Sequence, residues 1–216
     1  MKKYDLLVFD FDGTLVDTVG DIAYYANWTL KEYGYAGTHD VSRVKKAIGL
    51  GVHELLKDLE PMIAQSPEQL EIAAEYFKKG YRERPVRITE AFASARQMLD
   101  GPLASVKKAI VTNKPQDITE RILRELKMDH YFQMLIGMHA GFAPKPDPAG
   151  LLHVIKALGS TPDTTIFVGD SSVDAATSLN AHVDFAWVSY GYDEIKPGNA
   201  RWSLHSADQW KKLVGA

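Results

Sequence analysis

Five short apolar runs along the chain predict the strands of one sheet. They are Leu6–Phe9, Ala109–Val111, Met134–Ile136, Thr165–Val168 and Phe185–Val188. Each run is continuous rather than alternating, which is typical of parallel strands covered on both faces. Segments with helical spacing separate most of the runs. This alternation indicates an α/β fold with a doubly wound, Rossmann-like parallel sheet.

Two of the predicted helices illustrate the spacing. In "QDITERILRELK" the apolar residues Ile118 and Ile122 fall on one face. In "DPAGLLHVIKALG" we expect Asp147 to be the N-cap, Pro148 the first helical residue and Gly159 the stop.

The interval between the first two strands contains helical patterns and no convincing strand. One predicted helix follows Asp17 and Asp21, which are expected to serve its start, and another begins at a Ser66–Pro67–Gln69 capping box. We therefore predict an α/β core made of residues 1–14 and 86–216, with a small α-helical cap domain, residues 15–85, inserted into it. Arg84–Val86 suggest an extended return to the core.

Composition excludes several classes of function. The 216-residue chain has no cysteine, so disulfides, thiolate catalysis and cysteine-ligated metals are absent. The net charge is -3 with no basic block, which argues against a nucleic-acid partner. The apolar runs are too short for a membrane span, and no signal peptide is apparent. We expect a cytoplasmic monomer or homodimer.

Unusual polar residues collect at the predicted strand ends. Carboxyl ends of parallel strands line the ligand crevice of an open α/β sheet, so these side chains should converge. They are Asp10 and Asp12 after the first strand, Thr112 and Asn113 after the second, Asp170 and Asp174 after the fourth, and Lys145 ahead of a capped helix.

This set of groups suits phosphoryl chemistry. Carboxylates in small number suit Mg²⁺ with retained waters, whereas a hydroxyl and a lysine suit a phosphoryl group. A carboxylate can itself be the nucleophile, which assigns the attack on phosphorus to Asp10. Asp12 lies two residues further along an extended chain and so points the same way, as an acid and then a base. Gly13 permits close backbone approach.

Four motifs carry a family resemblance. "DFDGTLVD", "VTNK", "PKPDP" and "GDSSVDA", in this order, resemble the motifs of the haloacid dehalogenase-like hydrolase superfamily. The long helical insert resembles the cap of its phosphoglycolate phosphatase and β-phosphoglucomutase branch, and "AIVTNKP" and "SYGYDE" look most like the phosphoglycolate phosphatases.

The resemblance implies a role for each matching residue. Asp10 would be nucleophile and Mg²⁺ ligand, Asp12 the general acid–base whose backbone carbonyl also ligates the metal, and Asp170 the remaining protein ligand. Asp174 would not bind the metal directly but would orient the metal-bound waters or Lys145. The phosphate-binding set would be Gly13, Thr112, Asn113 and Lys145. Gly51 and His53 of the loop "IGLGVHELL" could reach the substrate.

One loop departs from the family pattern. Relatives often have a glycine and an aspartate in the loop before Lys145, where this chain has Met138 and His139. The departure removes no essential group.

The expected activity is Mg²⁺-dependent hydrolysis of a small phosphate ester through an aspartyl-phosphate, with 2-phosphoglycolate as the leading substrate. A phosphosugar mutase or a pyrophosphatase of the same superfamily remains an alternative. A dehalogenase would lack Asp12. A phospho-accepting signalling receiver domain would have a much shorter chain and no insert.

Overall fold

A six-stranded parallel sheet forms the centre of the computed structural model, which describes residues 4–35, 38–101, 103–194 and 196–214. The strand order is β5-β4-β1-β6-β7-β8. All five predicted strands are present, which confirms the doubly wound α/β fold. The sheet comprises β1 (Leu6–Phe9), β4 (Lys107–Pro115), β5 (Met134–Met138), β6 (Thr165–Gly169), β7 (Asp184–Val188) and β8 (Ala200–Leu204).

The central strand β1 shows why the sheet is covered on both faces. Successive side chains of a strand point to opposite faces. Accordingly, Leu7 and Phe9 lie in one apolar cluster and Leu6 and Val8 in another. The first cluster packs against α5 (Ala93–Asp100), α6 (Gln116–Glu125) and α9 (Ala207–Val214), and the second against α7 (Ala149–Ala157) and α8 (Ser172–Asn180).

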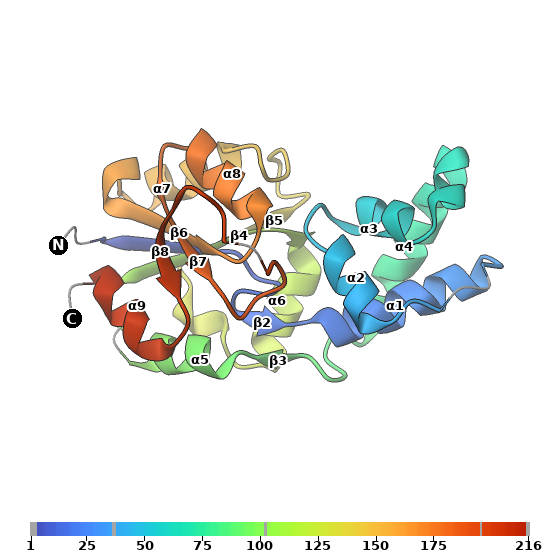
Figure 1. Cartoon of the computed structure of the whole chain (residues 1–216), viewed down its shortest axis with the longest axis horizontal. Helices are drawn as coiled ribbons and strands as arrows, with labels where there is room; N and C mark the ends of the chain where they lie inside the picture. Colours follow the sequence, from blue (N-terminus) through green and yellow to red (C-terminus); the bar gives the residue numbers. More distant parts are fainter. Residues whose placement is uncertain (1–3, 36–37, 102, 195, 215–216) are drawn as a thin grey trace.

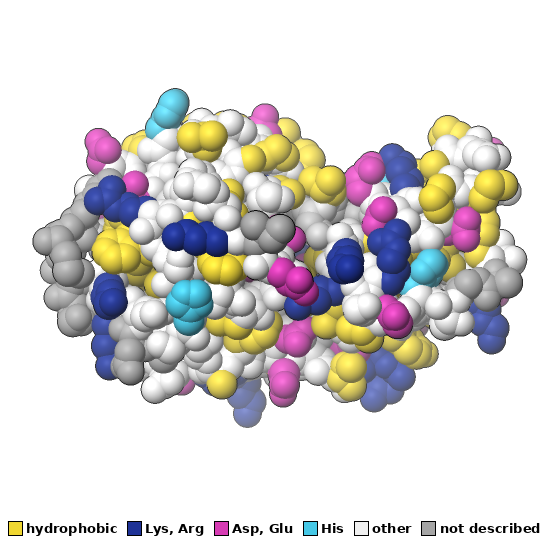
Figure 2. Space-filling model, in the orientation of Figure 1, with side chains coloured by type: hydrophobic (Ala, Val, Ile, Leu, Met, Phe, Trp, Pro, Cys, Tyr) yellow, Lys and Arg dark blue, Asp and Glu magenta, His cyan; other side chains and the backbone are white. Residues whose placement is uncertain are grey.

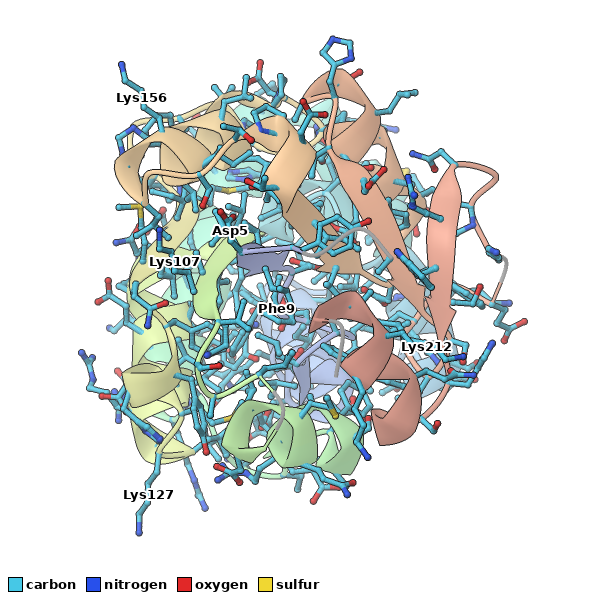
Figure 3. The ribbon with its side chains drawn as sticks, turned by 90° about the vertical axis from the view of Figure 1, so that its left-hand side faces the viewer. Asp5, Phe9, Lys107, Lys127, Lys156 and Lys212 are labelled. Atoms are coloured by element: carbon cyan, nitrogen blue, oxygen red, sulfur yellow. The ribbon has the colours of Figure 1, made fainter. Side chains whose placement is uncertain are left out.

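Figures 1 and 3 show this layered arrangement from two directions. In Figure 3, Phe9 lies inside, between the helices, whereas Lys127 and Lys156 point outward. Two short 3₁₀ helices, η2 (Asp129–Tyr131) and η3 (Pro162–Thr164), connect elements of this part of the molecule. Within the described residues, no helix has the length and apolar character needed to cross a membrane.

The segment between β1 and β4 is largely helical, as predicted. We call its helices the helical insertion: α1 (Val19–Glu32), α2 (Val41–Ala47), α3 (Val52–Leu59), η1 (Pro61–Gln65) and α4 (Pro67–Glu83). They lie together at one end of the sheet, opposite the two chain termini (Figure 1). The chain enters and leaves through an antiparallel ribbon of β2 (Val16–Asp17) and β3 (Glu90–Ala91).

Some boundaries differ from the predicted ones for physical reasons. Strand β4 runs on to Pro115, so the polar residues expected after it belong to the strand itself. The short ribbon β2–β3 and the half-exposed strand β8 carry too little apolar pattern to be recognised. Helix α7 begins at Ala149, one residue later than predicted, and Asp147 Oδ1 accepts its first N–H at 2.8 Å.

Asp21 holds the returning chain against the helical insertion. Asp17 serves the start of α1 as expected, since its Oδ1 accepts from Val19 N at 3.3 Å. The fully buried Asp21 instead accepts the backbone N–H groups of residues 87, 88 and 89 at 2.9, 3.2 and 3.0 Å, and the Thr89 hydroxyl at 2.6 Å. The sequence expectation for Asp21 was therefore wrong, because its partners come from a distant segment.

We expect Asp21→Ala to lower the free energy of unfolding by about 2–4 kcal/mol, because it leaves buried backbone donors unpaired. Urea denaturation measures the change. Glu32→Ala, an exposed carboxylate on the same helix, is the control and should change stability by no more than about 0.5 kcal/mol. Equal urea midpoints for the two variants would contradict this role.

Candidate active site

The predicted polar residues meet in one cavity at the carboxyl ends of β1, β4 and β6. The cavity encloses ≈ 740 Å³, counting the part that opens to solvent. Its wall on the sheet side is polar, and its wall on the side of the helical insertion is mostly apolar. The predicted site residues among its lining are Asp10, Asp12, Thr112, Asn113, Lys145, Asp170 and Gly51.

Lys145 lies between two carboxylates. Its Nζ is 2.7 Å from Asp10 Oδ1 and 2.6 Å from Asp174 Oδ1. All three side chains are buried. Burial by itself lowers the pKa of Lys145, but the charges of Asp10 and Asp174 raise it above its ordinary value. Lys145 therefore stays a cation at neutral pH.

One lysine does not balance the carboxylates around it. Oxygens of Asp10, Asp170 and Asp174 all lie within 4.8 Å of one another. Burial, and then the charge of Asp174, raise the pKa of Asp10 to about 7, and the same two causes raise that of Asp170. Buried like charges at this spacing need a further cation or protons. The three residues could hold a metal ion.

The oxygens of this cluster are not equally available. Both oxygens of Asp174 have partners. Oδ1 accepts a hydrogen bond from Lys145 Nζ, and Oδ2 accepts one from Ser171 N at 3.0 Å, so that Asp174 also caps α8. Asp170 accepts from Tyr192 N at 2.6 Å and from Thr14 Oγ1 at 3.1 Å. Asp10 forms its ion pair with Lys145 through Oδ1.

The side chain of Asp12 turns away from this cluster. Its carboxylate accepts from Lys114 Nζ at 3.0 and 3.3 Å and from Thr18 Oγ1 at 2.5 Å. Lys114 also donates to Tyr81 OH at 3.0 Å. Asp12 thus sits beside Asp10 in sequence, but its carboxylate belongs to a separate polar group.

The predicted phosphate-binding residues occupy different positions. Thr112 lines the cavity, and its Oγ1 accepts from Lys114 N at 3.2 Å. The Asn113 amide is engaged with backbone: it donates to Gly49 O and Lys145 O at 3.0 and 2.9 Å and accepts from Lys145 N at 2.7 Å. Its side chain thus holds Lys145 in place.

Gly13 has a positive φ of +83° and packs directly against Asp170, since a Cβ built there would lie 2.3 Å from Asp170 Oδ2. A side chain at this position is therefore excluded both by backbone conformation and by space.

The loop of the helical insertion reaches the cavity only in part. Gly49 and Gly51 line it, and a Cβ built on Gly51 would lie 2.7 Å from Cε of Met138. His53 is not among the described lining residues. Its Nε2 lies 2.8 Å from Glu71 Oε2 on the exposed side of α4. His139 adopts a positive φ of 72° at the end of β5.

Comparison with known proteins identifies the family. A family model described as "Haloacid dehalogenase-like hydrolase" matches residues 7–188. The chain belongs to the haloacid dehalogenase-like hydrolase family. The predicted resemblance is therefore confirmed.

Individual relatives agree with the family model. "Phosphoglycolate phosphatase 1" of Pseudomonas aeruginosa is 32% identical over 97% of this chain and 82% of its own length. "Phosphoglycolate phosphatase" of Aquifex aeolicus is 31% identical over 97% and 96%. A solved structure of "a predicted phosphoglycolate phosphatase" from Haemophilus somnus 129pt has a TM-score of 0.88 and 26% identity, covering 98% of this chain and 99% of that one. These findings support a phosphatase.

Several residues at this site were not predicted as site residues from the sequence. Lys114 and Tyr192 line the cavity, and Thr18 contacts Asp12. Lys114 could have been found, because it stands in the motif "VTNK" directly after Thr112 and Asn113. Tyr192 and Tyr81 carried no local signal.

Gly13→Ala should disable the hydrolase, because the new methyl group would displace the Asp170 carboxylate. We expect a loss of about a hundredfold or more in p-nitrophenyl phosphate turnover. Gly34→Ala is a matched control: its φ is +82°, but nothing lies within 4 Å of its Cβ position. It should add backbone strain of about 1–2 kcal/mol and leave turnover near wild type. Similar activities of the two variants would show that the contact with Asp170 is unimportant.

Proposed function

We propose that this phosphatase is a Mg²⁺-dependent phosphomonoesterase that acts through an aspartyl-phosphate, with 2-phosphoglycolate as its leading substrate. The observation that carries the proposal is the placement of Lys145 between Asp10 and Asp174, with Asp170 beside them, where Asp10, Lys145 and Asp170 line the cavity. A carboxylate nucleophile, a buried cation and a metal-binding carboxylate are what transfer of a dianionic phosphoryl group requires.

The proposed chemistry has two steps. An oxygen of Asp10 attacks phosphorus, the P–O bond to the alcohol breaks, and Asp12 gives its proton to the departing oxygen. Water then attacks phosphorus of the aspartyl-phosphate, Asp12 takes a proton from that water, the P–O bond to Asp10 breaks, and inorganic phosphate leaves. Lys145 and Thr112 hold the phosphoryl oxygens, and Lys145 offsets the charge that develops on them.

The metal proposal rests on the donor set. Asp10 and Asp170, which line the cavity, would hold the ion, while Asp174 pairs with Lys145 through one oxygen and caps α8 with the other. Oxygen donors in small number suit Mg²⁺. Bound there, Mg²⁺ would offset the repulsion between nucleophile and phosphate.

We also propose that residues 15–85 form a cap domain over a core of residues 1–14 and 86–216. Closing such a cap excludes bulk water and places its own residues against the leaving group. Three contacts support the proposal: Asn113 with Gly49 O, Lys114 with the Tyr81 hydroxyl, and Arg82 with Asp117. Gly51 is the proposed substrate contact of the cap. His53, paired with Glu71 outside the cavity, is not.

The names of the relatives favour 2-phosphoglycolate. The cavity itself favours a second candidate as well, because its wall on the insertion side is apolar. Ile22, Ile48, Val52, Leu55 and Phe77 form that wall. An ester of a larger apolar alcohol would bury more apolar area there than a two-carbon acid.

The metal proposal predicts a pH-dependent effect of Mg²⁺ on stability. The raised pKa values of Asp10 and Asp170 mean that the metal-free folded protein binds more protons than the unfolded chain between about pH 4 and 7. Its stability should fall as pH rises through that window. Millimolar Mg²⁺ should then raise the melting temperature by roughly 3 °C or more at pH 7.5 and by less at pH 5.5.

Asp170→Asn is the control, since it removes one charge and one ligand at little cost in volume. It should reduce the response to Mg²⁺ in thermal unfolding. EDTA should abolish turnover by the wild-type enzyme. Full activity in chelator, together with no thermal response at pH 7.5, would remove the metal from the proposal.

The substrate proposal is tested by a screen of small phosphate esters. We expect kcat/KM for 2-phosphoglycolate to exceed that for hexose phosphates by roughly tenfold or more. Asp10→Asn should be inactive on all of them while remaining folded, because an amide neither attacks phosphorus nor carries charge.

Other outcomes separate the alternatives. A better apolar ester supports the second candidate. Transfer of phosphate between sugar hydroxyls indicates a mutase, and release of two phosphates from pyrophosphate a pyrophosphatase. Turnover by Asp10→Asn close to wild type rules out Asp10 as the nucleophile.

A further inference from the structure

Lys114 places a second buried ammonium group in the cavity. Only 3% of its side chain is exposed, and it lines the cavity from the end of β4. The two lysines Lys114 and Lys145 are the cationic side chains among the described lining residues. Buried lysines are rare unless paired, so the position of this one calls for a partner of opposite charge.

The two lysines have different surroundings. Lys145 lies between two carboxylates, Asp10 and Asp174. Lys114 has a single carboxylate partner, Asp12, and its other described hydrogen bond goes to the phenol of Tyr81. Burial raises the pKa of Tyr81 well above its ordinary value, so the phenol is neutral. An ammonium has three N–H donors, and the described contacts go to the two oxygens of Asp12 at 3.0 and 3.3 Å and to the phenol at 3.0 Å. A ligand carboxylate in the cavity would share or replace the longer contact, to Asp12 Oδ2.

The position of Lys114 matches the second end of a small dianionic or trianionic ester. Thr112, the proposed phosphoryl contact, precedes it by two residues, and its hydroxyl accepts from Lys114 N at 3.2 Å. Lys114 Nζ lies 3.0 Å from Oδ1 of Asp12, the proposed proton donor to the leaving group, so Lys114 is on the side of the cavity where the alcohol part of the ester would lie. In 2-phosphoglycolate, the ester oxygen and one methylene group separate phosphorus from the carboxylate, so the carboxylate belongs to the leaving group that Lys114 would face.

The geometry points to Lys114 as the residue that binds the carboxylate of the substrate, so that the cavity selects phosphate esters with a second anionic group close to phosphorus. The inference rests on the proposed function, of which it explains the substrate preference. Tyr81 of α4 is a positioning residue: its hydroxyl accepts from Nζ at 3.0 Å, and Nζ lies 4.5 Å from the ring centroid.

The test compares two phosphonates that cannot be hydrolysed. 3-Phosphonopropionate replaces the ester oxygen of 2-phosphoglycolate by a methylene group, and propylphosphonate also lacks the carboxylate. Calorimetry on the full chain with Mg²⁺ should show that the wild type binds 3-phosphonopropionate about tenfold or more tightly. In Lys114→Met and in Lys114→Gln this ratio should fall to within about threefold.

Lys45→Met is the matched control. Lys45 Nζ lies 5.6 Å from the Tyr192 ring, near the cavity but not among its lining residues. Lys45→Met should leave the ratio of the two phosphonate affinities unchanged. A general effect of positive charge would instead lower this ratio in Lys45→Met and Lys114→Met alike. Tyr81→Phe should lower the ratio less than Lys114→Met.

The outcomes distinguish this inference from the proposed function. Equal binding of both phosphonates by the wild type overturns the role of Lys114. This comparison needs no variant, so it holds even if Lys114→Met and Lys114→Gln fail to fold. An equal loss of affinity for both in Lys114→Met also overturns it, because Lys114 would then act on the phosphoryl end through Asp12. If the ratio behaves as expected but 2-phosphoglycolate is not hydrolysed, the carboxylate site stands and the proposed substrate falls.

Discussion

Mutual repulsion among the buried carboxylates of Asp10, Asp170 and Asp174 is the constraint on which the rest of the site depends. Their oxygens lie within 4.8 Å of one another, where unscreened like charges cannot all persist. Three groups offset part of this repulsion. Lys145 pairs with Asp10 and Asp174, the backbone N–H of Tyr192 donates to Asp170, and the backbone N–H of Ser171 donates to Asp174. Even so the pKa of Asp10 is raised to about 7, first by burial. A site built in this way needs another cation or protons.

The junction between the sheet and the helical insertion carries a second layer of charge. Lys114 links Asp12 of the sheet side to Tyr81 of α4, and Asn113 links Lys145 to Gly49 of the insertion loop. Figure 2 shows acidic side chains near this junction and basic side chains on the surface of the helical insertion beside it. Residues that line the cavity thus also contact the helical insertion.

Much of the architecture was predictable because it is encoded locally. The apolar runs predicted five strands, since a strand buried on both faces must be continuously apolar. The placement of Asp10, Thr112 and Asp170 at one edge followed from parallel topology alone. Strand β8 was missed because an edge strand with half-exposed side chains lacks such a run. Asp21 was misread because its position at a helix start resembles capping, whereas its partners are backbone donors 66 to 68 residues away.

By itself, the sequence determined the sheet, the helical insertion and the residue types that converge at the strand ends, because periodicity and turn chemistry act over a few neighbouring residues. Tertiary structure alone decided which partner each charged group has. Asp12 and Lys114 are 102 residues apart, and Lys145 and Asp174 are 29 apart. Whether a buried carboxylate faces a lysine, a hydroxyl or another carboxylate depends on how distant elements pack. For that reason the division between the carboxylate cluster around Lys145 and the separate Asp12–Lys114–Tyr81 group could be seen only in the folded chain.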